Sequence, residues 1–248
     1  MANFYLVEEL AAASVGDEVT LGTAESRHAV TVSRTRVGER LIVGNGRGLT
    51  VHGTVLTAAP TAVVVRVDAS ASTPPAEPRL ILVQALAKGG RDELAVQAAT
   101  ELGVDTVVPW SAARSVARWD GQKALKGRER WATIVREATK QSMRPWLPTV
   151  EALASTADLE AHAGGRRMLV LEPTAPLALS ALVLTEPGRP DARDLQLVVG
   201  PEGGIADHEL DRLAAAGAQL VRLGSTVLRT STAGPAAIAV LNAMLGRW

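Results

Sequence analysis

Hydrophobic positions divide the chain into a β-rich first part and a second part in which short apolar runs alternate with amphipathic segments. In the first part, runs of β-branched residues separated by glycine-rich turns predict strands, with one short helix before them. The expected helix covers residues 24–33, and the expected strands cover residues 39–43, 49–56 and 62–68. This pattern predicts a small β-barrel of about 70 residues, a common size for an accessory domain.

The second part has the rhythm of an α/β domain. Strands are expected at residues 80–86, 106–109, 168–171, 195–199 and 220–223, and helices at 92–102, 129–142, 207–216 and 234–245. In the last helix Ile238, Leu241 and Leu245 share one face. Strands that alternate with helices in this way predict a parallel sheet covered on both faces.

A proline-rich stretch separates the two parts. Residues 68–78 combine three prolines with small polar residues, which favour neither a helix nor a central strand. We therefore interpret this stretch as a linker between a domain at residues 1–73 and a domain at residues 79–248.

Composition narrows the chemistry. The chain has no cysteine, which excludes disulfides and thiolate metal sites and suits a cytoplasmic protein. Its four histidines lie far apart without metal-ligand spacing, so no metal is expected. No apolar run approaches the roughly 20 residues that span a bilayer, so no membrane partner is expected either.

The net charge is zero but unevenly spread. Residues 114–144 contain nine lysines and arginines against three acids. Such a local excess is typical of a site for a polyanion, although a solvated helix face balanced by an acidic neighbour explains it equally well.

Three loops follow three successive late strands, at residues 171–173, 199–204 and 223–233. Ligands of open α/β sheets bind outside the carboxyl ends of the strands, so these loops predict a binding site. Glycines in the second loop permit close approach of a ligand, although a simple strand-to-helix turn also uses glycine. The glycine-rich residues 44–48 are followed by a strand rather than a helix, so they predict a hairpin turn and not a dinucleotide site.

Two of these loops carry motifs that resemble a known family. Residues 197–204 (LVVGPEGG) and 223–233 (LGSTVLRTSTA) resemble the SPOUT methyltransferases and, more narrowly, the RsmE family, which methylates N3 of a uridine in small-subunit (16S) ribosomal RNA. Weaker blocks extend the resemblance over most of residues 24–244. Ser231 stands where the family usually has glutamate, Ile205 where an aromatic residue is common, and Ala206 where a capping hydroxyl is usual, which leaves Asp207 as a candidate cap.

The resemblance implies a SPOUT-type C-terminal domain with a deep trefoil knot, a small N-terminal PUA-like β-barrel that binds RNA, and an obligate homodimer. It implies that S-adenosylmethionine (AdoMet) is bound by the three loops, and that 16S rRNA, free or in an assembled small ribosomal subunit, is the substrate. The implied cofactor-binding residues are Leu171, Glu172, Pro173, Val199, Gly200, Glu202, Gly203, Gly204, Leu223, Gly224, Val227, Leu228, Thr230, Thr232 and Ala233.

Arginines are the candidates for catalysis. Uridine N3–H is a poor nucleophile at neutral pH, and a cation near the base edge favours its anion by lowering the pKa of N3. Arg144 and Arg229 are the first candidates and Arg114 the next, although Arg229 equally fits a structural brace. Glu202 either faces the cofactor or caps a turn.

RNA contacts are expected mainly from basic residues, because phosphates dominate the affinity of proteins for nucleic acids. Aromatic residues make up only 3%, so base stacking is sparse; Trp131 fits burial in its helix, whereas Trp146 fits burial or stacking. Gln141 either hydrogen-bonds the uracil edge or is a surface residue. The expected RNA-binding residues are Arg34, Arg36, Lys88, Arg91, Arg136, Lys140 and Gln141.

Two other functions fit parts of this pattern. A tRNA methyltransferase of the same superfamily keeps the cofactor loops, although the blocks around residues 114 and 141–144 argue against it. A non-catalytic RNA-binding factor for ribosome assembly needs the basic segment but no cofactor site.

Overall fold

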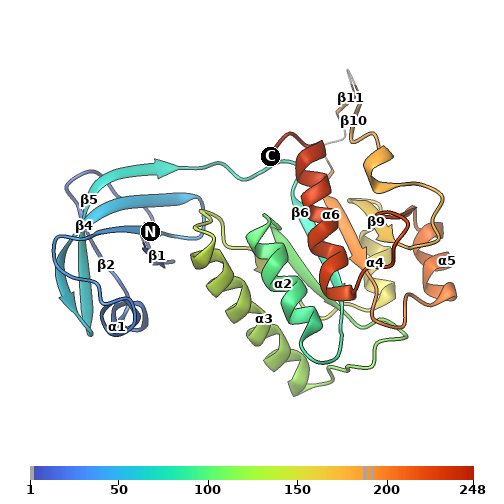
Figure 1. The fold of residues 1–248 in the computed structure, drawn as a ribbon, viewed down its shortest axis with the longest axis horizontal. Coiled ribbons are helices and arrows are strands. Elements are labelled where there is room, and N and C mark those ends of the chain that lie inside the picture. The colour runs from blue at the N-terminus through green and yellow to red at the C-terminus, as the bar shows by residue number, and fades with distance from the viewer. Residues whose placement is uncertain (1–2, 187–188, 191–192) are drawn as a thin grey trace. The chain divides into compact units, whose positions relative to one another are not determined.

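Two units make up the chain, and the first is built from two separate stretches of sequence (Figure 1). The computed structural model describes residues 3–186, 189–190 and 193–248. The first unit comprises Met1–Pro75 and Thr139–Leu147, and the second comprises Ala76–Ala138 and Pro148–Trp248. The sequence division at residues 73–79 did not include the return of the chain at Thr139–Leu147 to the first unit.

The first unit is a five-stranded sheet with one helix. Its strand order is β1-β3-β4-β5-β2, in which β1 runs parallel to β3 and every other pair is antiparallel. The hairpin predicted at residues 44–48 is confirmed, because β3 and β4 pair across it. The elements are β1 (Asn3–Leu6), β2 (Glu18–Thr20), α1 (Thr23–Thr31), β3 (Arg40–Gly44), β4 (Leu49–Ala59) and β5 (Ala62–Ser72).

One apolar core holds this sheet and α1 together. It includes Tyr5, Leu21, Ala29 and alternate valines of β4 and β5, as expected where one face of a sheet is buried. The expected linker begins too early, because β5 continues to Ser72, which pairs with Leu49. Small and polar residues stay in the ladder here since the backbone of an eleven-residue β4 offers them partners.

The segment Thr139–Leu147 is bonded into the first unit. The Trp146 indole N–H donates to the Thr73 carbonyl oxygen at 2.9 Å, and the Leu147 N–H donates to the Gly46 carbonyl oxygen at 2.9 Å. The Lys140 ammonium lies 3.2 Å from a Glu25 carboxylate oxygen, and both side chains are largely buried. Trp146 is therefore a packing residue of this unit, with only partial exposure.

The second unit is built on a six-stranded sheet in which all neighbouring strands are parallel. The strand order is β13-β9-β12-β6-β7-β8. These strands are β6 (Leu80–Ala85), β7 (Thr106–Trp110), β8 (Thr149–Val150), β9 (Arg167–Leu171), β12 (Leu195–Val199) and β13 (Gln219–Val221). Four of them are almost wholly buried, which fits the near-continuous apolar runs of a parallel sheet covered on both sides.

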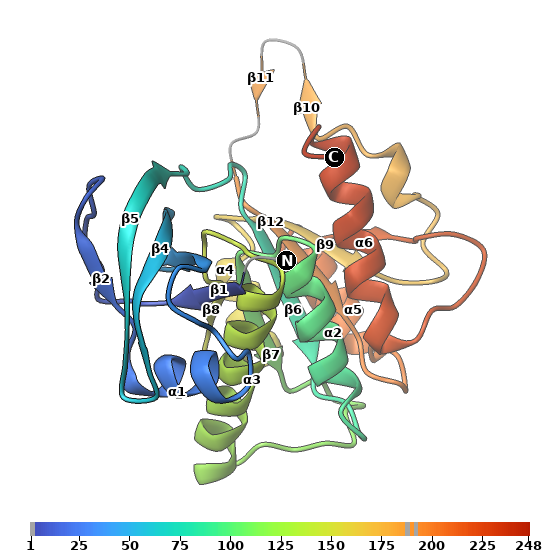
Figure 2. The ribbon, with the colours of Figure 1, turned by 60° about the vertical axis from the view of Figure 1, so that its left-hand side comes forward.

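Helices cover both faces of this sheet. Ile81 and Val83 pack in one core with Leu159 and Leu213, from α4 and α5. The opposite face carries α2 and α6, which lie side by side (Figures 1 and 2). The helices are α2 (Arg91–Glu101), α3 (Gln122–Gln141), α4 (Thr156–His162), α5 (Asp207–Ala215) and α6 (Thr230–Met244); β10 (Thr185–Glu186), β11 (Arg189–Pro190) and the short 3-10 helix η1 (Leu179–Ala181) lie between β9 and β12.

Two helices begin earlier than predicted, in each case because a glycine permits close packing. Helix α3 begins at Gln122 rather than Glu129, and a Cβ on its Gly127 would lie only 2.5 Å from the Trp119 ring. Helix α6 begins at Thr230 rather than Gly234, and a Cβ on Gly234 would meet Leu82 at 3.0 Å. Within the described residues, no helix is long and apolar enough to cross a membrane.

We predict that Lys140→Ala destabilises the first unit by about 3 kcal/mol, because it removes the ammonium that lies 3.2 Å from the buried Glu25 carboxylate. Native-state hydrogen exchange at β4 and β5 measures this loss. The matched control is Arg66→Ala in the same unit, whose ion pair with Asp68 is exposed and contributes at most about 1 kcal/mol. Equal effects of the two variants would show that the Lys140–Glu25 pair is not a buried contact in solution.

Candidate active site

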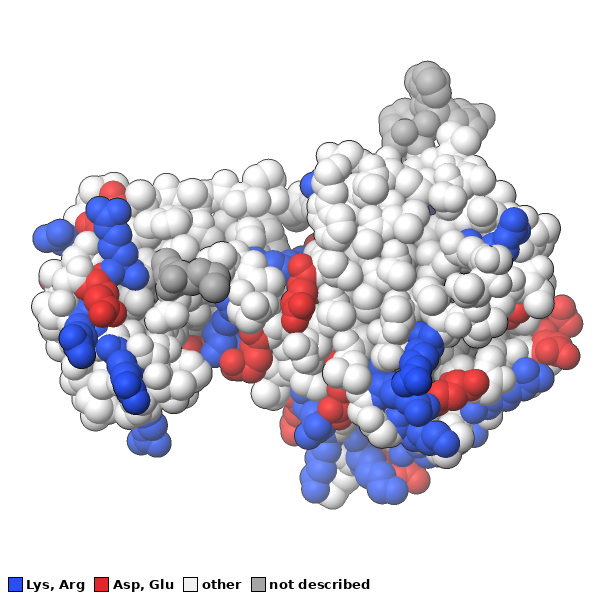
Figure 3. Space-filling model, viewed as in Figure 1, with Lys and Arg blue, Asp and Glu red and all other residues white. Residues whose placement is uncertain are grey.

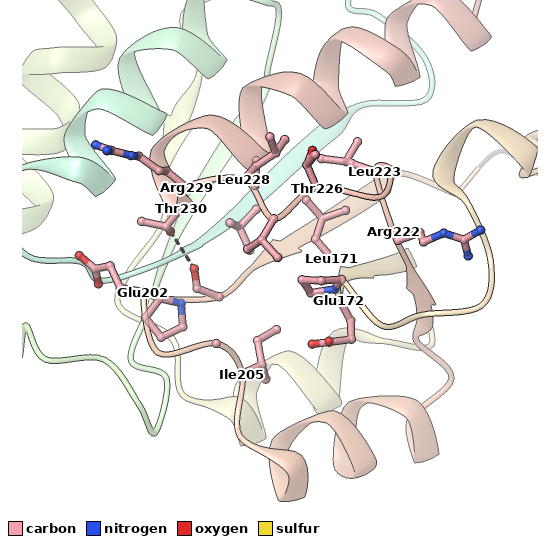
Figure 4. A pocket seen from close by; sticks show the side chains of 18 of the residues that line it. Leu171, Glu172, Glu202, Ile205, Arg222, Leu223, Thr226, Leu228, Arg229 and Thr230 are labelled. Atoms are coloured by element: carbon pink, nitrogen blue, oxygen red, sulfur yellow. Dashed lines mark hydrogen bonds between the residues drawn. The ribbon is translucent and has the colours of Figure 1, made fainter.

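Three loops of the second unit meet around one cavity of about 400 Å³ (Figure 4). They follow β9, β12 and β13, which are neighbours in the sheet and run parallel, so their carboxyl ends lie at the same edge. The lining residues are Arg91, Leu171, Glu172, Pro173, Val199, Gly200, Pro201, Glu202, Gly204, Ile205, Val221, Arg222, Leu223, Gly224, Thr226, Val227, Leu228, Arg229, Thr230 and Ala233.

The cavity has apolar walls and charged ends. Side chains of Leu171, Ile205 and Leu228 face its interior, whereas Glu202 and Arg229 lie toward one end and Glu172 lies away from them (Figure 4). A volume near 400 Å³ with apolar walls and few polar groups is typical of a site for a small molecule or cofactor.

The second loop turns so tightly that side chains are excluded at two of its positions. Gly204 has φ +72°, in the left-handed region that favours glycine, and its N–H donates to the Pro201 carbonyl oxygen at 2.9 Å. A Cβ on Gly200 would lie 2.7 Å from a side-chain carbon of Ile205. The backbone itself therefore forms this wall of the cavity.

Glu202 belongs to an ion pair at the edge of the cavity. One of its carboxylate oxygens accepts hydrogen bonds from the Arg91 guanidinium at 2.9 Å and from the Lys88 N–H at 3.2 Å. Burial alone would raise the pKa of Glu202, but hydrogen bonds from its own N–H, from Arg91 and from Lys88 outweigh it and hold the pKa below its usual value. Glu202 is thus an anion at neutral pH.

The three arginines that line the cavity differ in what they contact. Arg91 is paired with Glu202, and Arg222 points away from the cavity, where its guanidinium donates to the carbonyl oxygens of Ala175 and Pro176 (Figure 4). Within the described part of the chain, the guanidinium of Arg229 has no carboxylate or carbonyl partner. Arg229 therefore differs from Arg91, whose charge Glu202 offsets, and from Arg222, whose guanidinium is hydrogen-bonded outside the cavity.

Arg114 lies outside the cavity and contacts the second loop. Its guanidinium donates to the Ile205 carbonyl oxygen at 3.2 Å and approaches an Asp207 oxygen at 3.5 Å. Asp207 does not cap α5 as predicted; instead the Glu209 carboxylate accepts the Ala206 N–H at 3.3 Å, and also the Ala113 N–H at 3.0 Å. These contacts make Arg114 a brace of the loop from its outer side.

The cavity collects most of the residues predicted to bind a cofactor. All of them line it except Gly203 and Thr232, and a Cβ on Gly203 would instead lie 3.3 Å from Arg114. Five further lining residues were not among the predicted cofactor-binding residues, although two of them lie within the predicted loops at 199–204 and 223–233; they are Pro201, Ile205, Val221, Arg222 and Thr226.

Residues predicted to contact RNA differ in their exposure to solvent. Arg91 and Lys140 are engaged by Glu202 and Glu25, so neither is a free phosphate contact in this structure. Basic side chains gather at the end of the second unit that carries the first turns of α3 (Figure 3). The remaining predicted residues are exposed, or partly exposed in the case of Arg136; they are Arg34, Arg36, Lys88, Arg136 and Gln141.

Arg144 is the one catalytic candidate outside the second unit. It belongs to the segment Thr139–Leu147, and its N–H donates to the Thr139 carbonyl oxygen at 3.1 Å. Its proposed action on uridine therefore stays a prediction.

Comparison with known proteins places this arrangement in a family. Profiles of the RNA methyltransferase domain and of the RNA methyltransferase PUA domain match residues 74–242 and 15–68. A Mycobacterium tuberculosis protein named ribosomal RNA small subunit methyltransferase E is 43% identical over 229 residues, which cover 90% of this chain and 86% of that protein. The chain belongs to this RNA methyltransferase family.

Other family members agree. A ribosomal RNA small subunit methyltransferase E from a Synechocystis strain is 32% identical over 237 residues, covering 92% of this chain and 73% of that protein. The crystal structure of the Neisseria gonorrhoeae family member bound to S-adenosyl methionine matches with a TM-score of 0.86, at 26% identity and 98% coverage of both chains. The SPOUT-type α/β fold and the PUA-like first unit predicted from the sequence are thereby confirmed.

We predict that NMR titration of the Glu202 carboxyl carbon gives a pKa below its ordinary value of 4.5, and that Arg91→Met raises it. Because the pKa is lowered on folding, the contribution of this pair to stability is present above the ordinary pKa and is lost as pH falls through the lowered one. If the pKa of Glu202 were the same in the wild type and in Arg91→Met, the ion pair between Arg91 and Glu202 would be contradicted.

Proposed function

We propose that this chain transfers a methyl group from AdoMet to N3 of a specific uridine in 16S ribosomal RNA. The observation that carries the proposal is the meeting of the three family loops around one cavity in the second unit. The N. gonorrhoeae relative of the same fold binds S-adenosyl methionine, which supports the choice of cofactor.

The residues of the cavity fit this cofactor. Its volume lies within the range of small-molecule sites, and apolar side chains such as Leu171 and Leu228 would sandwich a flat adenine. The carboxylates of Glu172 and Glu202 suit a ligand that carries an ammonium and a sulfonium group. When bound, AdoMet would supply an electrophilic methyl group, while the chain orients the two reactants and excludes water.

Arg229 is the residue that we assign to activation of the uridine. Loss of the N3 proton leaves negative charge on the base edge, and an adjacent guanidinium lowers the pKa of N3 by stabilising that charge. Arg91 is less suited because Glu202 offsets its charge, and Arg114 because it is occupied by the second loop. Arg229 alone among the three lines the cavity without a described partner.

We further propose that the PUA-like unit binds RNA through exposed arginines such as Arg34 and Arg36, and that the enzyme works as a homodimer in the cytoplasm on free or assembled small subunits. The resemblance supports the dimer and the trefoil knot. Val227, an exposed apolar residue at the edge of the cavity, fits a partner surface there.

We expect small-subunit RNA from a strain that lacks this gene to lose one reverse-transcription stop at a uridine, because N3 methylation blocks base pairing. Complementation with the wild-type gene restores the stop. A lost stop in tRNA instead would support the tRNA alternative. An unchanged RNA together with no AdoMet binding by the purified protein would support the non-catalytic RNA-binding factor.

Arg229→Ala is predicted to lower the rate of methyl transfer by about 10²- to 10³-fold, the range for loss of one charge-stabilising group. AdoMet affinity, measured by calorimetry, should change little because the guanidinium acts on the RNA base. Arg79→Ala is the control, since Arg79 is another exposed arginine that precedes β6 at the opposite edge of the sheet, where it pairs with Asp194. Loss of AdoMet binding in parallel with activity would show that Arg229 holds the cofactor instead.

A further inference from the structure

Gln84 is a polar residue in a strand that is otherwise apolar. It is the fifth residue of β6, all of whose residues are buried, and it is completely inaccessible to solvent. Burial of an amide is costly unless it is hydrogen-bonded. Its amide nitrogen donates to the Thr230 hydroxyl oxygen at 2.9 Å and to the Ala85 carbonyl oxygen at 3.1 Å, so two bonds compensate for the loss of water.

Thr230 continues this network into the cavity wall. Its hydroxyl donates to the Gly200 carbonyl oxygen at 2.7 Å, the bond drawn as a dashed line in Figure 4. A carbonyl only accepts, so the single hydroxyl proton of Thr230 goes to Gly200. The Thr230 oxygen must then accept from Gln84, which fixes the orientation of the amide. The other amide atom, the Gln84 carbonyl oxygen, has no partner among the described residues, as expected if Thr230 sets that orientation.

The position of these groups connects two of the three loops. Gly200 is the first residue after β12, in the second loop, and Thr230 is the first residue of α6, where the third loop enters this helix. Gln84 stands beside both, because its register partner in β12 is Val199. The Thr230 hydroxyl thereby links the central strand β6 to the beginning of the second loop and to the end of the third loop.

We propose that Gln84 is a positioning residue, which acts through Thr230 to hold the second and third loops at the separation that AdoMet binding requires. This inference rests on the proposed function. Gln84 does not line the cavity, so its effect on the cofactor passes through the relay from Gln84 to Thr230 to Gly200.

A double-mutant cycle tests the relay. Thr230→Val keeps the side-chain shape but removes both hydrogen bonds, and Gln84→Met removes the donor to Thr230. We expect Thr230→Val to weaken AdoMet binding about 10-fold and Gln84→Met about 3- to 10-fold, in the range of one buried hydrogen bond. Thr230→Ser, which keeps the hydroxyl, should bind within about 2-fold of wild type. Because the two residues act in series, Gln84→Met should have little further effect when added to Thr230→Val.

Controls separate positioning from general stability. Thr100→Val removes a buried hydroxyl that donates to the Val96 carbonyl oxygen at 2.8 Å in α2, away from the three loops. It should lower the unfolding temperature as Thr230→Val does, yet leave AdoMet affinity unchanged. Hydrogen exchange of the ligand-free protein should be faster at residues 200–205 and 223–229 in Thr230→Val than in Thr100→Val.

The outcomes are distinct. Additive losses in the double mutant, equal losses in Thr230→Ser and Thr230→Val, or unchanged loop exchange would each overturn the relay. Failure of the wild-type chain to bind AdoMet would instead refute the proposed function and the cofactor role of the relay together. In that case the exchange rates still decide whether Gln84 and Thr230 hold the loops.

Discussion

The parallel register of β13, β9 and β12 is the constraint on which the site depends. Parallel strands place all their carboxyl ends at one edge of the sheet. Because these three strands are neighbours, the loops that follow them lie next to one another. The chain reaches this arrangement although residues 171 and 223 are separated by more than fifty positions. The sheet therefore determines where the cavity lies, and the loops determine only its shape and charge.

The arginines in and around the cavity differ in whether a protein group engages them. The second loop is held from one side by the contact of Arg91 with Glu202 and from the outside by the contact of Arg114 with the Ile205 carbonyl oxygen. Both arginines donate hydrogen bonds to the loop, and the negative charge of Glu202 offsets the positive charge of Arg91. Arg229 has no such described partner, which is why the proposed function assigns to it the charge that develops on the uridine.

Sequence patterns predicted the strands of the second unit well, because a buried parallel strand is a short apolar run with clear ends. They also located the three loops that meet at the cavity, since glycine, proline and strand ends are local signals. They were wrong on the start of α6, where Gly234 and Pro235 look like a boundary but lie inside the helix. Gly234 is needed for the close approach of α6 to Leu82, which is a tertiary contact that no local pattern contains.

Two residues predicted to contact RNA have ion pairs that the sequence did not reveal. Lys140 and Arg91 are basic, and from type alone each fits a phosphate contact, but each has a carboxylate partner that is distant in sequence: Glu25 and Glu202. Pairing over such separations depends on the fold, and above all on the return of Thr139–Leu147 to the first unit. The number of basic residues in a segment is thus larger than the number available to bind RNA, because some of them pair with carboxylates elsewhere in the fold. For this chain, the cations that could bind RNA are to be sought among the exposed lysines and arginines rather than along the whole of residues 114–144.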